Sequence, residues 1–238
     1  MADGNVKVLG AWPSPFVMRV RVALHLKSVD YDNIEENLLE AKSELLLKSN
    51  PLHKKVPVLI HGDKFVCESL IIVQYIDELW CSAPSILPSD PYDRAESRFW
   101  AAYVLYIHNC FFPALRRVLL GPTEEDQKAA MAEVLEGVVL LEEAFKRLSK
   151  GKAFFGGDNV GYVDLAAGSL LAWIQVIEKF TETKLLSEDK TPSLVTWADC
   201  FSSHAAVKDV FPDTDKLADF GMKFRAEILK AAAATTTN

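Results

Sequence analysis

The first 80 residues alternate between two patterns of hydrophobic and polar positions, one typical of strands and one typical of helices. Residues 6–11 predict a strand, residues 31–34 a second strand and residues 56–67 a β-hairpin. Apolar positions at helical spacing predict helices at residues 16–27, 38–49 and 68–80. Because strands that alternate with helices are typical of small α/β folds, we expect this segment to form an α/β unit.

From Tyr92 onward the pattern changes to helices alone. Helical spacing predicts long segments at residues 94–120 and 124–149, an apolar buried helix at 163–179, and two or three helices over 191–230. Gly121-Pro122 separates the first two segments, and Pro113 is expected to kink the first. Prolines at 84, 88 and 91 indicate a linker. We therefore expect an α/β unit at residues 1–81, a linker at 82–92 and an all-helical unit at 93–238.

The segment Trp12-Pro13-Ser14-Pro15-Phe16 joins the first predicted strand to the first predicted helix. Serine is a favoured N-cap, and a proline at the first helical position needs no hydrogen-bond donor. The Ser14 hydroxyl is therefore expected beside free N–H groups and the positive end of a helix dipole, which suits an anion or a thiolate. From this segment alone two interpretations stay open: Ser14 only caps its helix, or it also holds a ligand.

Composition restricts the classes of protein to consider. Of the 238 residues, 50% are hydrophobic and 25% are charged, which is ordinary for a globular protein. The chain has no basic block or aromatic-basic stripe, which argues against nucleic-acid binding. Because the formal net charge is −7, an anionic ligand would depend on local lysines. No apolar run in the sequence is long enough to span a membrane, so no membrane partner is expected.

The four cysteines, Cys67, Cys81, Cys110 and Cys200, are far apart and include no C-x-x-C pair. We therefore expect neither a zinc site nor a disulfide framework, and we expect no other metal. Reduced thiols fit a reducing compartment. The polar start of the chain, Met-Ala-Asp-Gly-Asn, has no apolar signal region. These features predict an intracellular, cytoplasmic protein.

Pro57 lies inside an apolar strand pattern, where a proline removes one donor from the ladder of hydrogen bonds. An edge strand or a cis peptide bond would each account for it, and this position alone leaves both open. Three features coincide at this point. They are a polar residue at a strand–helix hinge, a Val-Pro-Val-Leu segment that begins the later hairpin, and Glu68-Ser69 at the start of the next helix.

Together these features resemble the thioredoxin-like domain of the glutathione transferases, joined here to the all-helical second domain of that family. Six motifs narrow the resemblance to the plant tau class, in the right order and at the right spacing along nearly the whole chain. They are Ser14-Pro15-Phe16, residues 48–59 (KSNPLHKKVPVL), Glu68-Ser69, residues 75–78 (YIDE), residues 87–92 (LPSDPY) and residues 155–158 (FGGD). The resemblance implies an α/β thioredoxin-like N-terminal domain and an all-α C-terminal domain.

The resemblance also implies a set of glutathione-binding residues: Ser14, Lys42, Lys55, Val56, Pro57, Glu68 and Ser69. Ser14 would be the catalytic residue, since a hydroxyl donor beside a helix start favours the thiolate, which is the nucleophile. Glu68 and Ser69 would hold the γ-glutamyl end. Val56, before a proline that is cis in the family, would offer its backbone to the cysteinyl part. Lys42 and Lys55 would meet the glycyl carboxylate.

A second, apolar site would receive the electrophile. The positions that the family implies carry Phe16, Tyr106, Asn109, Phe112, Trp173, Phe220 and Phe224. Aromatic residues at helical spacing also fit a protein core, so these assignments rest on the resemblance. His108 could be a base that faces this site or an ordinary helix histidine.

The chain departs from the tau pattern in one region above all. Leu105 stands where tau members commonly have an acid, and the helix that follows is unusually apolar up to Pro113. This departure puts in doubt the acceptor specificity and any polar contact that the acid would make across a dimer. Gly161, with Asp164 three residues later, also stands where the family often has a Ser or Thr N-cap.

The main functional prediction is a glutathione S-transferase that joins the thiolate of its co-substrate glutathione to hydrophobic electrophiles, as in detoxification of xenobiotics and herbicides and in stress responses. Two alternatives stay open: glutathione-dependent reduction of organic hydroperoxides, and non-catalytic carriage of hydrophobic ligands. A thiol-transferase is disfavoured, because Ser14 stands where those relatives have a cysteine. The family further implies a homodimer.

Overall fold

The first part of the chain forms the expected α/β unit. The computed structural model describes residues 5–81, 84–105 and 111–235. Its first elements are β1 (Val6–Gly10), α1 (Pro15–Leu26), β2 (Asp32–Glu35), α2 (Glu44–Ser49), β3 (Val58–His61), β4 (Lys64–Cys67) and α3 (Ser69–Leu79). The predicted order of strand, helix, strand, helix, hairpin and helix is confirmed.

The four strands form one sheet in the order β2-β1-β3-β4. β1 runs parallel to β2 and antiparallel to β3, and β3 runs antiparallel to β4. The register places Gly10, at the end of β1, opposite Glu35, and Leu9 opposite Val58. Val58 also pairs with Cys67, the last residue of β4. The segments that follow β1, β2 and β4, and the segment that precedes β3, therefore meet at one end of the sheet.

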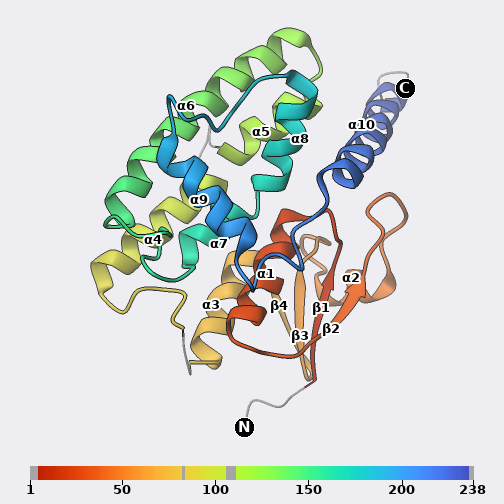
Figure 1. Ribbon diagram of the computed structural model, residues 1–238. Helices are drawn as coiled ribbons and strands as arrows, with labels where there is room; N and C mark the ends of the chain where they lie inside the picture. Colours follow the sequence, from red (N-terminus) through yellow and green to blue (C-terminus); the bar gives the residue numbers. More distant parts are fainter. Residues whose placement is uncertain (1–4, 82–83, 106–110, 236–238) are drawn as a thin grey trace.

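Helices cover both faces of this sheet. Val6, Val8 and Leu59 point toward α1 and α3 and belong to the main hydrophobic core. Leu9 and Val58 are in a second cluster with Leu46 of α2, on the opposite face. Figure 1 shows α1 and α3 between the sheet and the helical half of the molecule, with α2 on the far side. The central strand β1 is therefore buried on both faces, with successive side chains in different clusters.

The rest of the described chain is helical. Its elements are α4 (Pro91–Leu105), α5 (Phe111–Leu120), α6 (Glu124–Leu148), α7 (Tyr162–Gly168), α8 (Leu171–Thr181), α9 (Pro192–Ser203) and α10 (Thr214–Thr235). All seven residues of α7 are buried, and α7 contacts α1, α4 and α9. Among the described residues, no helix is long and apolar enough to cross a bilayer.

The prediction of one helix at residues 163–179 is wrong. The chain leaves helical geometry between Gly168 and Leu171, and α7 and α8 are separate helices. Gly168 lies against the ring of Phe201, where an added Cβ would come within 2.4 Å of a ring carbon. The Ser169 hydroxyl accepts a hydrogen bond from Arg19 of the other unit. Apolar spacing alone cannot reveal such tertiary contacts, which explains the error.

The predicted helix at residues 94–120 corresponds to α4 and α5 in the described part of the chain. α4 ends at Leu105, α5 begins at Phe111, and the two helices contact each other. The connection between them, residues 106–110, lies outside the described residues. Pro113 is the third residue of α5 as described. The break at Gly121-Pro122 is confirmed, and Thr123 caps α6.

Leucines at helical spacing over residues 38–49 predict a helix with Ser43 as a possible N-cap, and this cap is confirmed. The helix is Glu44–Ser49, and Ser43 caps it by accepting from the Leu46 N–H at 3.1 Å. The buried Glu36 carboxylate accepts from both the N–H and the hydroxyl of Ser43. These bonds hold the preceding residues in a loop, although Leu38 and Leu39 continue the spacing of the leucines in the helix.

The two units share a continuous hydrophobic core and several polar contacts. Lys27 and Asp77 form a buried ion pair with an Nζ–Oδ1 distance of 2.8 Å. The Asp77 carboxylate also accepts from the N–H groups of Ile86 and Leu87, at 2.8 and 2.9 Å. The connection between α3 and α4 is thereby fixed to the α/β unit. This attachment keeps the helical unit in a defined position beside the sheet.

Asp164 organises the start of α7. Its fully buried carboxylate accepts from the backbone N–H groups of Phe155, Gly156 and Gly161 and from the indole N–H of Trp197, at 2.7–2.9 Å. Burial raises the pKa of this carboxyl to about 6 despite the four donors. A Cβ on Gly161 would lie 2.8 Å from the Cα of Gly156, so this N-cap position requires glycine. The departure noted at Gly161 is thus explained by close backbone packing.

Candidate functional site

The β1–α1 hinge is a tight turn that ends on Ser14. The Ser14 N–H donates to the Ala11 carbonyl at 3.0 Å, which closes a turn over residues 11–14. Ser14 is buried, and its Oγ accepts from the Val17 N–H at 3.4 Å as the N-cap of α1. Pro15 is the first residue of the helix. The predicted cap is confirmed.

The cap leaves the Ser14 hydroxyl able to donate. A serine oxygen can accept a hydrogen bond while its own hydrogen points elsewhere. The first turn of α1 carries the positive end of the helix dipole. This hinge can therefore stabilise an anion by a hydroxyl donor and by the helix end together.

Two further hydrogen bonds fix the hinge from outside the turn. The Trp12 N–H donates to Glu35 Oε1 at 2.7 Å, which ties the hinge to the end of β2. The indole Nε1–H of Trp173, on α8, donates to the Pro13 carbonyl at 3.0 Å. One tether comes from the α/β unit and the other from the helical unit, so the hinge lies where the two units meet.

The Val56–Pro57 peptide bond is cis, as the resemblance implied. The two residues immediately precede β3, whose first residue pairs with Leu9 near the end of β1. Asn50 is buried and orders the loop before them: its Nδ2 donates to the Lys55 carbonyl at 2.9 Å, and its Oδ1 accepts from the His53 N–H at 3.1 Å. Val56 is half-buried and Pro57 is buried beside the hinge.

Glu68 and Ser69 connect β4 to α3 at the same end of the sheet. Glu68 has a φ of 69°, an unusual backbone conformation for a residue with a side chain. Such strained residues cluster at binding sites and switch regions. Its carboxylate lies 3.9 Å from His53 Nε2. Ser69 is buried as the first residue of α3, so its hydroxyl and N–H lie at a helix start.

Arg19 contributes to the site although the sequence analysis did not select it. The side chain is fully buried, and its Nη1 donates to Ser69 Oγ at 3.3 Å. Its Nε donates to Ser169 Oγ at 2.9 Å, and its Nη2 donates to the Ala166 carbonyl at 2.8 Å. The guanidinium also lies over the Phe16 ring, 5.0 Å from its centroid. The sequence signal for this role was an arginine on the buried face of a predicted amphipathic helix.

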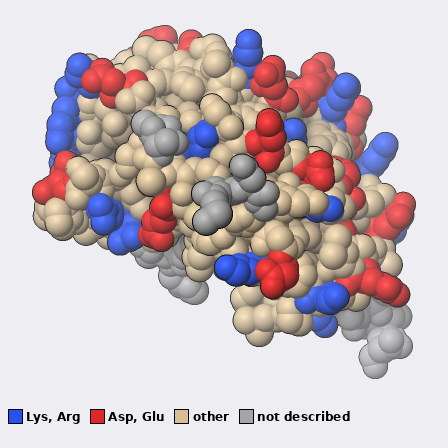
Figure 2. Space-filling view, turned by 90° about the horizontal axis from the view of Figure 1, so that it is seen from below, with Lys and Arg blue, Asp and Glu red and all other residues tan. Residues whose placement is uncertain are grey.

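The two predicted lysines are exposed. Lys42 lies in the loop after β2, and Lys55 lies immediately before Val56. Both segments adjoin the end of the sheet that carries the hinge, so both ammonium groups are available to an anion there. On the face shown in Figure 2, basic and acidic side chains are interspersed among wide uncharged areas. Attraction of an anion to this site therefore depends on nearby cations.

The predicted aromatic residues form two groups. Phe16 contacts Phe112 edge to face, with ring centroids 5.0 Å apart. Phe220 and Phe224 of α10 stack at 5.7 Å, and Phe220 contacts Trp12 at the same centroid distance. Trp12 was not among the predicted site residues, although Trp12 stands in the hinge. Tyr106, Asn109 and His108 lie outside the described residues.

Cys67 ends β4 beside Glu68 but is not a competing nucleophile. Its Sγ lies 3.6 Å from the Ser49 carbonyl. Burial, together with the neighbouring Glu68 carboxylate, raises the pKa of this thiol. A thiol with a raised pKa carries less of the reactive thiolate at neutral pH.

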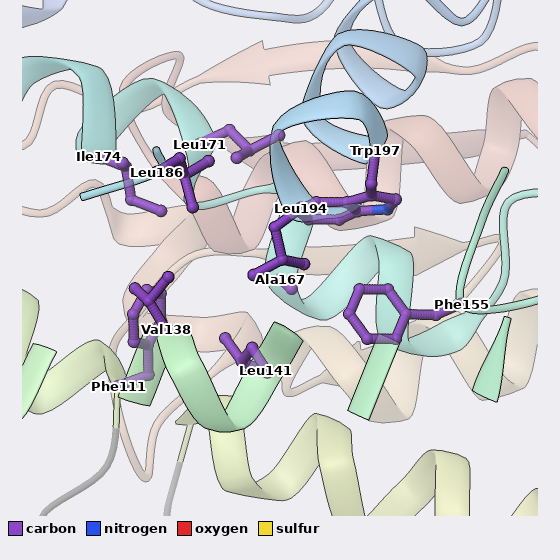
Figure 3. A pocket seen from close by; sticks show the side chains of 10 residues that line it. All are labelled: Phe111, Val138, Leu141, Phe155, Ala167, Leu171, Ile174, Leu186, Leu194 and Trp197. Atoms are coloured by element: carbon purple, nitrogen blue, oxygen red, sulfur yellow. The ribbon is translucent and has the colours of Figure 1, made fainter. Parts of the chain in front are cut away.

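Two hollows among the described residues lie away from this site. Figure 3 shows one of about 10 Å³ in the core of the helical unit, lined by ten apolar side chains that include Phe111 and Trp197. That volume is about the minimum for a single water molecule, so the cavity holds no organic ligand. Another hollow, of about 430 Å³, lies between α6 and the α8–α9 connection. No predicted site residue lines either one.

Two family models match the chain. One, described as the N-terminal domain of glutathione S-transferase, matches residues 4–78. The other, described as the C-terminal domain of glutathione S-transferase, matches residues 99–205. The gap between the two matches contains the connection between α3 and α4.

Individual proteins are similar over nearly the whole chain. Glutathione S-transferase U17 of Arabidopsis thaliana is 57% identical over 224 residues, which cover 94% of this chain and 97% of the relative. The tau-class glutathione S-transferase of mango, Mangifera indica, is 56% identical, with a TM-score of 0.87 and coverages of 92% and 97%. Rice GST1, whose structure was solved in complex with glutathione, is 32% identical, with a TM-score of 0.84 and coverages of 95% and 99%.

Proposed function

The chain belongs to the tau class of the glutathione S-transferases, and from this premise we propose that Ser14 holds the sulfur of glutathione as a thiolate. The observation that carries the proposal is the N-cap geometry: Ser14 Oγ accepts from the Val17 N–H, which leaves its own hydrogen free for a ligand. The thiolate is the nucleophile, and a free cysteine thiol has a pKa of about 8.5. A donor and a helix start both favour the anion, so they increase the reactive fraction at neutral pH.

The γ-glutamyl end of glutathione would lie at Glu68 and Ser69. Its ammonium carries the charge that the Glu68 carboxylate attracts, and its carboxylate suits the Ser69 hydroxyl and N–H at the start of α3. Arg19 supports this assignment, because its Nη1 occupies an acceptor position of Ser69 Oγ. The Ser69 hydroxyl hydrogen is then directed toward the ligand, since an arginine can only donate.

The rest of the tripeptide would extend along the segment before β3. Val56 precedes the first paired residue of that strand, so its N–H and C=O are suited to bind the cysteinyl part. Lys42 and Lys55 are exposed on loops at the same end of the sheet and would attract the glycyl carboxylate. A ligand of this length would contact all seven predicted glutathione residues at this end of the sheet.

The acceptor would be a hydrophobic electrophile bound by the aromatic residues beside the hinge. Phe16 follows Ser14 by two residues and contacts Phe112, while Trp12 contacts Phe220 on the other side. With an aryl halide, the glutathione sulfur forms a bond to the ring carbon, the carbon–halogen bond breaks, and the halide leaves with its electron pair. Ser14 donates to the sulfur throughout and forms no covalent bond. The names of the relatives do not favour hydroperoxide reduction or non-catalytic carriage.

The proposed active form is a homodimer of two-domain subunits, with domain boundaries near residues 82–92. Large apolar side chains of Phe65, Ile71, Tyr92 and Phe99 are exposed on β4, α3 and α4, and Tyr92 is 69% exposed. Exposed apolar side chains of this kind often mark protein interfaces. Light scattering after size-exclusion chromatography should give twice the 26.5 kDa of one chain, and a monomer would contradict the proposal.

We place the protein in the cytoplasm as part of the same proposal. Cys67, Cys81 and Cys200 are free thiols in the part of the chain that the structure describes. Free thiols persist in reducing compartments, which supports this location. Imaging of a fluorescent fusion protein checks it, and confinement to a secretory compartment would contradict it.

Replacement of Ser14 by alanine tests the proposed catalytic role. Loss of one donor to a developed anion is expected to lower kcat/KM with an aryl halide by about 10²-fold. Thr123→Ala is the matched control, because it removes the N-cap of α6 far from the hinge. Both variants lose about 1 kcal/mol of capping energy, but only Ser14→Ala should lose activity. Undiminished conjugation by Ser14→Ala would show that the assignment is wrong.

A further inference from the structure

Trp173 makes two contacts that place it between the thiolate site and the C-terminal helix. Its indole N–H donates to the Pro13 carbonyl, the backbone group immediately before Ser14, at 3.0 Å. Its ring lies against Gly221 of α10, where an added Cβ would come within 3.2 Å of a ring carbon. The indole is therefore held between the hinge and α10.

The same hinge receives a second aromatic contact from α10. Phe220, next to Gly221 in sequence, meets the Trp12 ring edge to face at 5.7 Å. Figure 1 shows the lower end of α10 close to the β1–α1 connection. Trp12 and Trp173 thus contact two consecutive residues of α10, Phe220 and Gly221. Trp173 donates its side-chain N–H to the hinge backbone, whereas the hydrogen bond of Trp12 comes from its main-chain N–H.

We infer that Trp173 is a positioning residue for Ser14, in addition to any contact that its ring makes with the acceptor. Its N–H fixes the Pro13 carbonyl, and this peptide leads directly into the serine that would donate to sulfur. The inference rests on the proposed function of Ser14. It assigns to an aromatic residue of the second domain a role in the ionisation of glutathione, which is bound by the first domain.

The physical reason is the steep dependence of a donor on its position. A hydroxyl stabilises a developed anion only at hydrogen-bonding distance and in the correct direction. The closed turn of residues 11–14 transmits a shift of Pro13 to Ser14 because its ends are hydrogen-bonded. Loss of the Trp173 hydrogen bond releases the Pro13 carbonyl, while Ser14 keeps its own hydroxyl. A partial loss of thiolate stabilisation is the consequence.

Trp173→Phe tests the inference, because it removes the N–H and keeps an aromatic ring. Trp100→Phe is the matched control: the Trp100 Nε1–H is buried and has no hydrogen-bond partner among the described residues. The pKa of enzyme-bound glutathione is measured by titrating the ultraviolet absorbance of the thiolate, with Ser14→Ala as the reference. For Trp173→Phe we expect a rise of about half a pKa unit and a loss of about fivefold in kcat/KM, the equivalent of one neutral hydrogen bond. Trp100→Phe should change neither.

The outcomes separate the inference from the proposed function. If Ser14→Ala raises the thiol pKa and Trp173→Phe leaves it equal to that of Trp100→Phe, the inference is overturned and the role of Ser14 stands. If Ser14→Ala itself leaves the thiol pKa unchanged, the proposed function fails and the inference fails with it. A purely structural role for Trp173 would lower thermal stability without any change in the thiol pKa, and that result also overturns the inference.

Gly221→Ala provides a second variant that keeps the tryptophan. The new methyl group would approach the indole to 3.2 Å and displace it by a few tenths of an ångström, which weakens the bond to Pro13. We expect a rise in thiol pKa that is smaller than that of Trp173→Phe. In the double variant the two effects should not add, because both act through one hydrogen bond. Full additivity would contradict the inference.

Discussion

The two halves of the proposed active site are built in different ways. The glutathione half lies at one end of the sheet and uses local devices: the Ser14 cap, the cis peptide bond before Pro57, and the helix start at Ser69. The acceptor half consists of side chains from the hinge, α5, α8 and α10, which are far apart in sequence. The first half is determined by turns and strand register, and the second by how helices pack on one another.

This difference implies different sensitivities to mutation. Residues of the glutathione half should change the thiol pKa or the KM for glutathione with little change in stability. The acceptor half depends on the frame of the helical unit, so its largest effects should come from residues that never touch a substrate. Four substitutions test this contrast, and they are given in order of expected size.

Asp164→Ala should have the largest effect, on stability. It leaves four N–H donors without an acceptor at the start of α7, the helix that leads into α8. We expect the free energy of unfolding to fall by about 4 kcal/mol in urea denaturation. Asp158→Ala is the control, because Asp158 is exposed in the same loop. A loss below about 1 kcal/mol would contradict the claim that Asp164 holds this frame.

Arg19→Leu should affect both halves at once. The substitution removes hydrogen bonds to Ser69, Ser169 and the Ala166 carbonyl across the two units. We expect a loss of about 3 kcal/mol in unfolding free energy and a rise in the KM for glutathione. Arg19→Lys should recover part of the stability, since it restores a charged donor. A stable Arg19→Leu variant with an unchanged KM would show that Arg19 does not link the halves.

Glu68→Gln should affect the glutathione half alone. It keeps the shape of the side chain and removes the charge that would attract the γ-glutamyl ammonium. We expect the KM for glutathione to rise about tenfold, which corresponds to about 1.4 kcal/mol, with kcat and stability nearly unchanged. Glu78→Gln, exposed near the end of the same helix, is the control. Equal effects of the two substitutions would remove Glu68 from the site.

Phe224→Leu should have the smallest effect, confined to the acceptor half. It removes the stacking of Phe224 on Phe220 but keeps an apolar side chain. We expect the KM for an aryl halide to change about threefold, the equivalent of a weak aromatic pair, while the KM for glutathione stays constant. Phe180→Leu, at an exposed position of α8, serves as the control. A change in the KM for glutathione instead would show that the two halves are not separable.

The same contrast explains which features the sequence could predict. The cap at Ser14, the proline at 57 and the Glu68-Ser69 helix start are local patterns, each legible within a few residues. The order of strands and helices in the first unit followed from the same short-range signals. The pairing register of the strands then places these segments at one end of the sheet.

The features that the sequence analysis missed depend on contacts between distant elements. The break between α7 and α8 follows from Phe201 against Gly168 and from Arg19 at Ser169. Leu38 and Leu39 continue the helical spacing of the leucines in α2, yet Glu36 holds residues 38–43 as a loop through Ser43. Trp12 escaped assignment because its partner, Phe220, is 208 positions further along the chain. Apolar spacing records which residues are buried but not their partners.

The hinge at Ser14 is proposed to make the thiol of bound glutathione more acidic. A titration of the thiolate absorbance of bound glutathione, in the wild-type protein and in Ser14→Ala, tests it most directly. We expect a wild-type thiol pKa about two units below the value of about 8.5 for a free thiol. In Ser14→Ala it should return to within about half a unit of that free value. A Ser14→Ala variant whose bound thiol is as acidic as in the wild type would contradict the account.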